Sequence, residues 1–500
     1  MAMKKYLYPF LILFLFTSPA MSETLYNLSS DWKLSLQNHT RVSGNFLGNN
    51  LDLNSDKSDG VAFMGFAYDM KLTTEYKDIF SSFFKLESNG PFDYDAPVLS
   101  DRKVNTISGQ VDNYRFPEII PRVEEYWVDT RVFSFPVKFK VGQYPYQVGN
   151  GYALGGYYEN YGASIYSTSE NFKWTVYYYK PDIVNKIVLG PQTPQEKDQG
   201  YAYDSNAHFL SLDIMVQWNG FSFQPYVGMV RDTTPADHRD NIYPYPVNED
   251  NLGTVGIDVN KDIDKLNIGI EVAKNFGSAN VTGNNSDIIH KGYMAHADVS
   301  YAFEKITPRS KMLISSGSKV DESDVLNGRI SSHSNNSFSV YSPANSNLFD
   351  TVYPSAQGPY VATGAGYAIN YGVLRPGAFG DPYQLNNLIM PNLGMGFSAS
   401  DKWTISLDYW YLRSYERPIG ALDNRAIKLS SDLGHEVDFS TDYKLTEHIT
   451  LNFLAGVFIP GKYYREKRDD GDALGLVPSP RFDGDADPAY QFEFGTEITF

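Results

Sequence analysis

Apolar and polar residues alternate with a period of two through most of this chain. From residue 64 to residue 75, one set of positions carries Met64, Phe66, Tyr68, Met70 and Leu72, and the other carries Gly65, Asp69, Lys71, Thr73 and Glu75. The same alternation recurs at residues 210–218 and 437–443 and in the last residues, 490–500. Strict alternation predicts β-strands with one apolar face, and no stretch has a convincing helical period.

The connections between these strands alternate between short and long. Short ones read FSFPV, TSENF, WNGFS, SASDK and KLTEH, and long polar ones cover residues 91–120, 182–206, 232–250, 277–290, 318–386, 414–431 and 461–488. Counting the segments gives about eighteen strands of about ten residues, with both ends on the short-turn side. The prediction is an all-β fold: a transmembrane antiparallel β-barrel over residues 23–500, with short periplasmic turns and long extracellular loops.

The tryptophans favour a membrane barrel over a soluble β-sandwich or propeller. Four of them adjoin the strand ends on the short-turn side and are in phase with the apolar face: Trp32, Trp174, Trp218 and Trp403. Tryptophan collects at membrane interfaces because its ring is apolar and its N–H needs a polar partner. We therefore predict that these residues form an interface girdle. A barrel of this size encloses more space than side chains can fill, so we expect a water-filled lumen or a lid, for which the 318–386 loop is the candidate.

The first 22 residues have the features of a secretory signal peptide. Two lysines precede an apolar run from Leu7 to Phe16, and Ala20 and Ser22 occupy the small-residue positions of a cleavage site. The run is shorter than the roughly 20 residues of a membrane-spanning helix. We expect cleavage after Ser22, export, and a final location in the outer membrane of a Gram-negative cell.

The chain ends on Phe500, directly after an alternating segment. A C-terminal aromatic in this setting resembles the signal by which outer-membrane barrels are recognised for insertion. The expected partners are therefore the barrel-insertion machinery, outer-membrane lipid and lipopolysaccharide, with periplasmic export components as a further possibility.

Composition excludes several other functions. The chain has no cysteine, so it has no disulfide, thiolate metal site or covalent c-type haem. Its net charge of −17 argues against nucleic acid as a partner. There is no G-x-S-x-G sequence, and HEVDF lacks the second histidine of a zinc motif. We predict no cofactor and no enzymatic activity.

Strand parity selects the residues that would face the lumen. The pore-lining candidates are Lys71, Lys85, Glu125, Trp127, Asp129, Arg131, Lys138, Lys140, Trp410, Glu436 and Asp438. Carboxylates outnumber cations on the predicted inner face, which predicts weak cation preference or none.

Two groups among these candidates have alternative interpretations. Arg131, Lys138 and Lys140 would form a basic ring, or else pair with Glu125 and Asp129 across the strands. Trp127 and Trp410 would be stacking platforms for sugar rings, or else a one-residue bulge turns them outward.

The long loop near the C-terminus has alternate aspartates, at Asp483, Asp485 and Asp487. Alternate carboxylates can supply the oxygens of a Ca²⁺ site. The glycine and glutamate that close an EF-hand loop are absent, so a solvated acidic loop is the alternative, and no specific metal site is predicted.

Two stretches of the chain match the motifs of a known family. In residues 433–464 the matching positions are Gly434, Glu436, Asp438, His448, Thr450, Leu451, Phe458, Pro460 and Gly461. In residues 123–151 they are Gly142, Gln143, Gly149 and Gly151, but the arginine of that motif is missing. With these positions the chain resembles the alginate-export family of outer-membrane porins.

The resemblance implies an eighteen-stranded barrel that lets a polysaccharide or another hydrophilic solute pass without an energy source. It also implies an arginine-rich lumen where the solute is a polyanion, and the acid-rich candidates here differ from that pattern. The alternative function is a structural sheath that houses a partner, such as a polymer-secretion component or a multihaem electron carrier.

Overall fold

The computed structural model describes most of the strands and the tight turns. The described residues are 24–27, 31–48, 61–89, 102–104, 111–113, 122–131, 135–149, 151, 153–156, 161–167, 169–180, 207–233, 247–281, 288–317, 334–335, 387–423, 425–467 and 486–499. The predicted signal peptide, nearly all of the 318–386 loop, Asp483, Asp485 and Phe500 lie outside these ranges.

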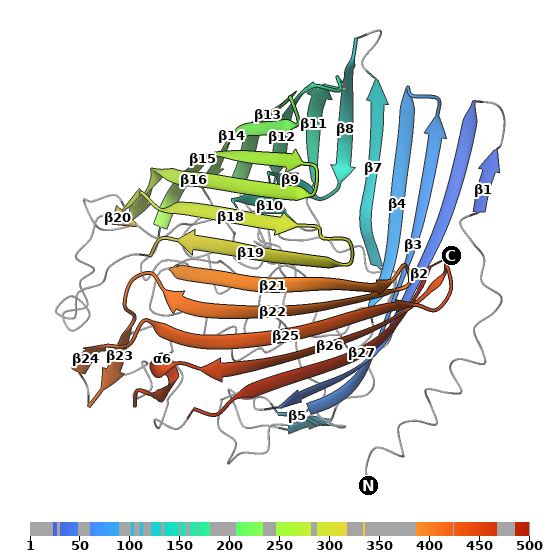
Figure 1. The fold of residues 1–500 in the computed structure, drawn as a ribbon. Coiled ribbons are helices and arrows are strands. Elements are labelled where there is room, and N and C mark those ends of the chain that lie inside the picture. The colour runs from blue at the N-terminus through green and yellow to red at the C-terminus, as the bar shows by residue number, and fades with distance from the viewer. Residues whose placement is uncertain are drawn as a thin grey trace.

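Eighteen antiparallel strands form the wall, which confirms the predicted number and fold class (Figure 1). The first nine are β2 (Trp32–Gly48), β3 (Val61–Tyr76), β4 (Phe80–Asn89), β7 (Arg122–Arg131), β8 (Val137–Gln143), β11 (Tyr161–Ser167), β12 (Phe172–Lys180), β13 (Ala207–Trp218) and β14 (Phe221–Asp232). The other nine are β15 (Val247–Ile263), β16 (Leu266–Val281), β18 (Tyr293–Tyr301), β19 (Ile306–Ser315), β21 (Leu388–Ser400), β22 (Trp403–Ser414), β25 (Asp432–Lys444), β26 (Ile449–Pro460) and β27 (Ala489–Thr499).

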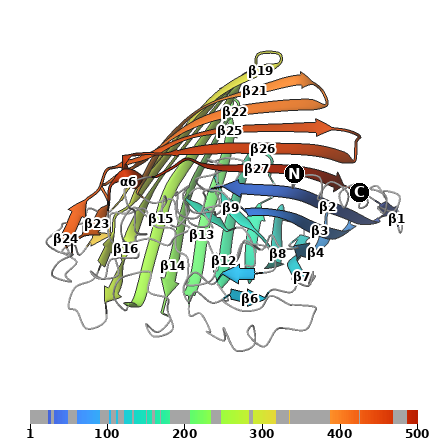
Figure 2. The same cartoon turned by 90° about the horizontal axis from the view of Figure 1, so that it is seen from below.

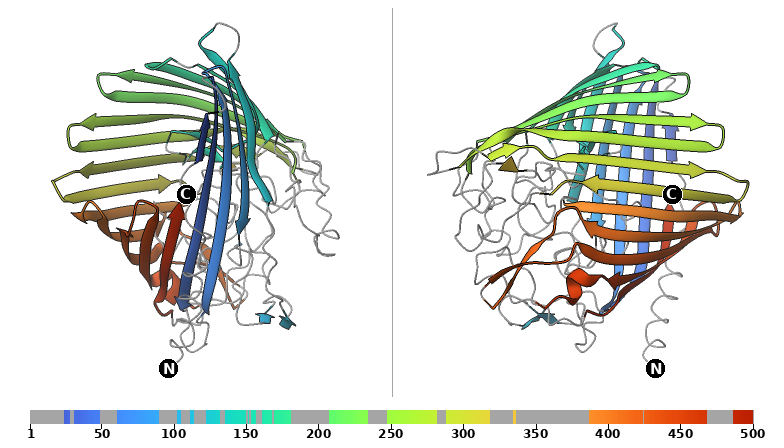
Figure 3. Two further views of the ribbon diagram at one scale, coloured as in Figure 1. Left: turned by 90° about the vertical axis from the view of Figure 1, so that its right-hand side faces the viewer. Right: turned by 60° about the vertical axis from the view of Figure 1, so that its left-hand side comes forward.

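The wall is closed because the last strand pairs with the first. β27 lies between β26 and β2, and Gly48 to His39 of β2 are in register with Tyr490 to Thr499 of β27 (Figures 2 and 3). Closure removes the free edges of the sheet, so the backbone groups of every wall strand can pair inside the membrane.

Tight turns join the strands at one end of the wall, called here the short-turn end, and the longer connections are at the long-loop end. Between β13 and β14 the turn is Asn219–Gly220, and both residues have positive φ, 49° and 73°. A two-residue hairpin turn of this kind favours Asn-Gly, so the local sequence WNGF sets the register of the pair.

The two faces of each strand differ in the way that the alternation predicts. On β13, Leu210 is 54% exposed on the outer face, whereas Phe209 and Ser211 on the inner face are each 2% exposed. Large apolar side chains are exposed around the whole outer wall, including Val227, Ile270, Leu393 and Leu407. An apolar outer surface of this extent fits a lipid environment.

The remaining elements are small. The short strands are β1 (Thr24–Asn27), β5 (Arg102–Val104), β6 (Val111–Asn113), β9 (Tyr146–Val148), β10 (Leu154–Gly156), β17 (Ile288–His290), β20 (Ser334–Asn335), β23 (Ile419–Leu422) and β24 (Arg425–Lys428), and one short helix is α6 (Lys462–Arg465). Within the described residues, no helix has the length and apolarity to span a membrane.

Candidate pore and its inner hairpin

A short hairpin lies inside the ring of strands. β9 and β10 pair antiparallel, with Val148 opposite Leu154, and we call residues 144–156 the inner hairpin (Figure 2). The chain leaves β8 through Gly142, whose φ is +140°. A Cβ there would lie 2.2 Å from the carbonyl oxygen of Tyr126, so only glycine allows this exit from the wall.

Tyrosines fix the base of the inner hairpin to the wall. The Tyr146 ring stacks on Tyr177 of β12 at a centroid distance of 3.9 Å and an interplanar angle of 5°. The Tyr144 hydroxyl donates a hydrogen bond to Oγ of Ser164 at 2.9 Å, and the hydroxyls of Tyr146 and Ser211 share another. Burial raises the pKa of Tyr144 to about 12, so its hydroxyl remains a neutral donor at physiological pH.

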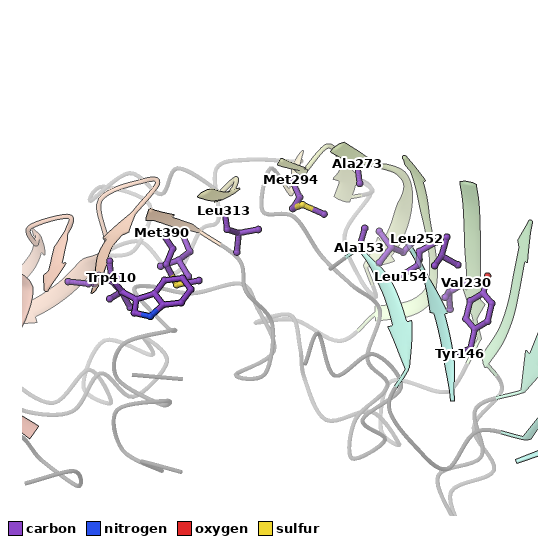
Figure 4. Packing of buried hydrophobic residues seen from close by; sticks show 14 of the residues in the cluster. Tyr146, Ala153, Leu154, Val230, Leu252, Ala273, Met294, Leu313, Met390 and Trp410 are labelled. Carbon is purple, nitrogen blue, oxygen red and sulfur yellow. The ribbon is translucent and has the colours of Figure 1, made fainter. Parts of the chain in front are cut away.

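The tip of the inner hairpin rests on β14, β15 and β16. Leu154 is 3% exposed and lies over Gly228, where a Cβ would approach its Cδ1 to 2.8 Å. At Gly149, which has φ of +57°, a Cβ would lie 3.0 Å from Cβ of Asp258 and 3.2 Å from Oε1 of Glu271. Figure 4 shows Ala153 and Leu154 beside the wall residues. Glycines on both partners therefore allow this close approach.

The wall beneath the inner hairpin, on the inner face of β11 to β16, is called here the covered wall. Its carboxylates are buried: Asp258 is 3% exposed and Glu271 is fully buried. Neutral groups hydrogen-bond to them. The Tyr226 hydroxyl donates to Glu271 Oε1 at 2.7 Å, and Nε2 of Gln224 donates to Asp213 at 3.2 Å.

A second stretch of inner wall, on β27, β2, β3, β4, β7 and β8, is called here the ion-pair wall. The ion pairs there are Arg41–Glu493, His39–Asp69, His39–Glu497, Lys71–Asp69, Lys85–Glu87, Lys138–Asp129 and Arg131–Asp78. Several members are open to solvent: the side chains of Arg41, Glu497 and Lys71 are 41%, 42% and 38% exposed. The ion-pair wall therefore presents charge to water, whereas the covered wall does not.

Arg131, Lys138 and Lys140 do not form a basic ring. Lys138 lies 3.9 Å from Asp129, but Arg131 pairs with Asp78 in the turn before β4, at 2.8 Å. Arg131 was expected to pair with Glu125 or Asp129, and that prediction is wrong for this residue. Arg131 is at the short-turn end of β7, where the turn residue is nearer than the strand carboxylates.

Lys140 instead lies over aromatic rings. Its Nζ is 3.8 Å from the centroid of Trp127 and 4.2 Å from that of Tyr144. Such cation–π contacts hold an ammonium group without a carboxylate. Lys140 thus links the inner hairpin to the ion-pair wall.

Both tryptophans among the pore-lining candidates lie on the inner face, and no bulge turns them outward. The Trp127 indole stacks on Phe83 from β4 at 5.5 Å, meets Lys140 from β8, and donates from Nε1 to Glu125 at 2.8 Å. Phe83 and Lys140 therefore contact the indole ring, which the sequence had suggested as a stacking platform for a sugar. Trp410 is 2% exposed and projects to the same side as Met390 and Leu313 (Figure 4).

Other predicted residues are placed as follows. Glu436 is fully buried, in register with Trp410, and Asp438 is in register with Asp408 on the same inner face. The girdle candidates Trp32, Trp174, Trp218 and Trp403 all lie on the outer face at the short-turn end. Trp32 is 38% exposed, Trp218 is 65% exposed and Trp403 is 45% exposed.

Of the three loop aspartates that were weighed as Ca²⁺ ligands, only Asp487 lies among the described residues. No group of histidine and acidic residues in the described part could hold a metal ion.

Sequence reasoning missed the inner hairpin. In the sequence, its first residues belong to the 123–151 stretch that resembles the family, and the candidate lid is the 318–386 loop. The available signal was the stretch GQYPYQVGNGYALGG, where glycines bracket closely spaced tyrosines. Tyrosine away from a membrane girdle, beside glycines that permit positive φ, indicates a compact segment packed inside.

The chain is similar to one known protein family and to several solved structures. The family described as alginate export matches residues 187–472. No curated protein matches the chain. OccAB2 and OccAB3 from Acinetobacter baumannii are each 9% identical with a TM-score of 0.49, and the alignments cover 93% of this chain and 98% and 99% of theirs. OpdK from Pseudomonas aeruginosa, solved with vanillate, is 8% identical with a TM-score of 0.48, covering 93% of this chain and 98% of its own.

The family match includes the 433–464 stretch that resembled it, whereas the 123–151 stretch lies before the matched residues. The match extends over more than half of the 500 residues. The chain therefore belongs to the alginate export family, and it is a porin-like channel of the outer membrane.

Proposed function

We propose that this channel gives passive passage to hydrophilic solutes without strong negative charge, including uncharged polysaccharide. A polyanion needs inner-wall cations that are free to meet it. Here the inner-wall cations that contact carboxylates are Arg41, Lys71, Lys85, Arg131, Lys138 and Arg309. This pairing is the observation that carries the proposal.

Three further inner-wall cations have other surroundings. Lys140 is held over two rings, and Lys173 lies at the short-turn end of β12, away from the inner hairpin. Lys311 is in register with Asp298 on the neighbouring strand. In the described part of the inner wall, most of the cations therefore contact or face a carboxylate, and the fields that the pairs produce are short-ranged in salt.

The inner hairpin is the proposed constriction. It extends from the long-loop end into the ring and is anchored by stacked tyrosines. A segment held in this way restricts the path of a solute more firmly than a surface loop. We also propose that the mature protein lacks residues 1–22 and that Phe500 serves the insertion machinery.

The test is conductance in planar bilayers containing the purified protein alone. We expect discrete channels, and a reversal potential in a KCl gradient that indicates weak cation preference or none. Clear anion selectivity would contradict the proposed solute class. A bilayer that stays silent would contradict a channel and favour a sheath that needs a partner.

A further inference from the structure

The outer surface of the barrel changes character from one end to the other. The tryptophans are at the short-turn end. Toward the long-loop end the outer face carries tyrosines together with basic residues: Tyr178, His208, Arg231, Lys274, Tyr293, Tyr409, Tyr411, Arg413 and His435. Tryptophan and tyrosine both suit a membrane interface, and the basic side chains among these tyrosines can also bind anions.

The residues on β22 and β25 form the most complete group, which we call the β22–β25 cluster: Tyr409, Tyr411, Arg413 and His435. The Tyr409 hydroxyl and Nδ1 of His435 share a hydrogen bond of 2.7 Å. The His435 ring also stacks on Tyr411 at 5.0 Å. Tyr411 and His435 are directly opposite in register, and Arg413 follows on the same face about 7 Å further along β22.

The hydrogen bond between Tyr409 and His435 leaves one donor of the pair over. If Tyr409 donates to Nδ1 of His435, then Nε2 of the ring carries a proton. If Nδ1 donates instead, the proton of the Tyr409 hydroxyl is left. In the described part of the chain only Nδ1 of this ring has a hydrogen-bond partner, so a donor remains in either tautomer.

Arg413 supplies positive charge beside these donors. Its side chain is exposed, and Asp432, its neighbour in register, accepts a hydrogen bond from the backbone N–H of Lys462 at 3.1 Å. A guanidinium presents a planar set of donors that matches a phosphate group. One arginine, one imidazole and one phenol on a single face therefore offer an anion site.

The surroundings of the cluster specify the kind of anion. Leu407 and Val437 lie next to the cluster on the same outer face, on the side toward the middle of the membrane, and are 47% and 41% exposed. An anion that also carries acyl chains would cover this apolar surface, and a free anion would not. We propose that the β22–β25 cluster binds a phosphate group of the lipid A part of lipopolysaccharide, with the acyl chains along Leu407 and Val437.

A related pair lies on β12 and β13, eight strands away around the ring of eighteen. The Tyr178 hydroxyl and Nδ1 of His208 share a hydrogen bond of 2.8 Å, and the rings stack at 6.1 Å. Arg231 is opposite His208 in register, but its Nε donates to Glu249 at 3.1 Å. Because Glu249 already engages this guanidinium, we expect this pair to bind lipid A more weakly than the β22–β25 cluster.

The experiment measures lipid A bound to the whole protein in detergent by native mass spectrometry. The double variant Arg413→Gln with His435→Gln should bind lipid A about tenfold more weakly, the effect of losing charge-assisted hydrogen bonds. Arg413→Lys should retain part of the binding, and Lys402→Gln, which removes an exposed cation at the short-turn end, should retain all of it. Heat-modifiable migration in gels shows that each variant is folded.

Unchanged binding in the folded double variant would overturn the proposal. So would equal loss in Lys402→Gln, or equally tight binding of phosphatidylglycerol, because the site would then be unspecific for lipid A. Conductance in phospholipid bilayers should be the same for wild type and double variant, so a failure of this inference is distinct from a failure of the channel function.

Discussion

The covered wall and the ion-pair wall belong to one continuous sheet, yet the carboxylates of the covered wall are buried whereas charged groups of the ion-pair wall are exposed to water. On the covered wall, Glu271 is fully buried beneath the inner hairpin and receives a hydrogen bond from a neutral tyrosine. On the ion-pair wall, Lys71 and Asp69 are 3.5 Å apart and Lys71 is 38% exposed. Strand alternation puts carboxylates on both walls, and only what lies over them decides their role.

The comparison separates structure from permeation. Carboxylates under the inner hairpin are removed from water and hold neutral donors in place, so their loss should affect stability and the constriction. Exposed pairs contribute little to stability individually, but their charges face the solute. Counting acidic residues by strand parity treats both classes as lumen charge and therefore overstates the field in the pore.

Removing the inner hairpin should give the largest effect. Gln143 and Tyr161 are partners in register across β8 and β11, so a Gly-Ser linker of about four residues can replace residues 144–160. Without this segment the constriction is lost, and single-channel conductance should rise about two- to threefold. The control replaces residues 234–240, which lie in another connection at the long-loop end, with a Gly-Ser segment of the same length as those residues. Equal conductance of the hairpin variant and wild type would contradict the constriction.

Substitution of Glu271 tests the covered wall at a single residue. Glu271→Ala leaves the buried Tyr226 hydroxyl without its acceptor, which should lower the free energy of unfolding by about 1–3 kcal/mol. Glu271→Gln keeps an acceptor and should cost less. Urea unfolding of the protein in lipid vesicles measures both. If the two variants lose the same stability, the hydrogen bond is not the cause.

The fold was predictable from the sequence to a greater extent than the site. Period-two alternation on β3, β13 and β25 depends only on local sequence, so the number of strands and the inner and outer faces follow from it. The environment of Trp127 does not follow, because it depends on which residues of β4 and β8 come opposite. Phe83 and Lys140 are 44 and 13 positions away in the chain, and only the register brings them to the indole.

The inner hairpin shows the same limit for loops. Alternation cannot distinguish a loop that folds into the barrel from one that stays outside, because both are polar and rich in glycine. The decisive contacts are the stack of Tyr146 on Tyr177 and the approach of Gly149 to Asp258. Both need the position of the covered wall, which no local pattern supplies.

Ion selectivity should respond to the ion-pair wall and not to the covered wall. Glu493→Gln combined with Glu497→Gln removes the carboxylates that face Arg41 and His39. The loss of these two negative charges should shift the permeability ratio toward chloride by about twofold. Glu271→Gln removes a buried carboxylate and should leave the ratio unchanged. Reversal potentials in a KCl gradient measure both variants, and an equal shift in the two would erase the distinction between the walls.

Lys71→Ala should have the smallest effect on stability. Its ammonium group contacts Asp69 at 3.5 Å, but it is well exposed, and Asp69 also contacts His39 at 3.0 Å. An exposed pair of this kind contributes about 0–1 kcal/mol, and the remaining histidine partner limits the loss further. Urea unfolding in the vesicles used for the Glu271 variants gives a direct comparison. A loss as large as that of Glu271→Ala would mean that the ion-pair wall, like the covered wall, is held together by groups shielded from water.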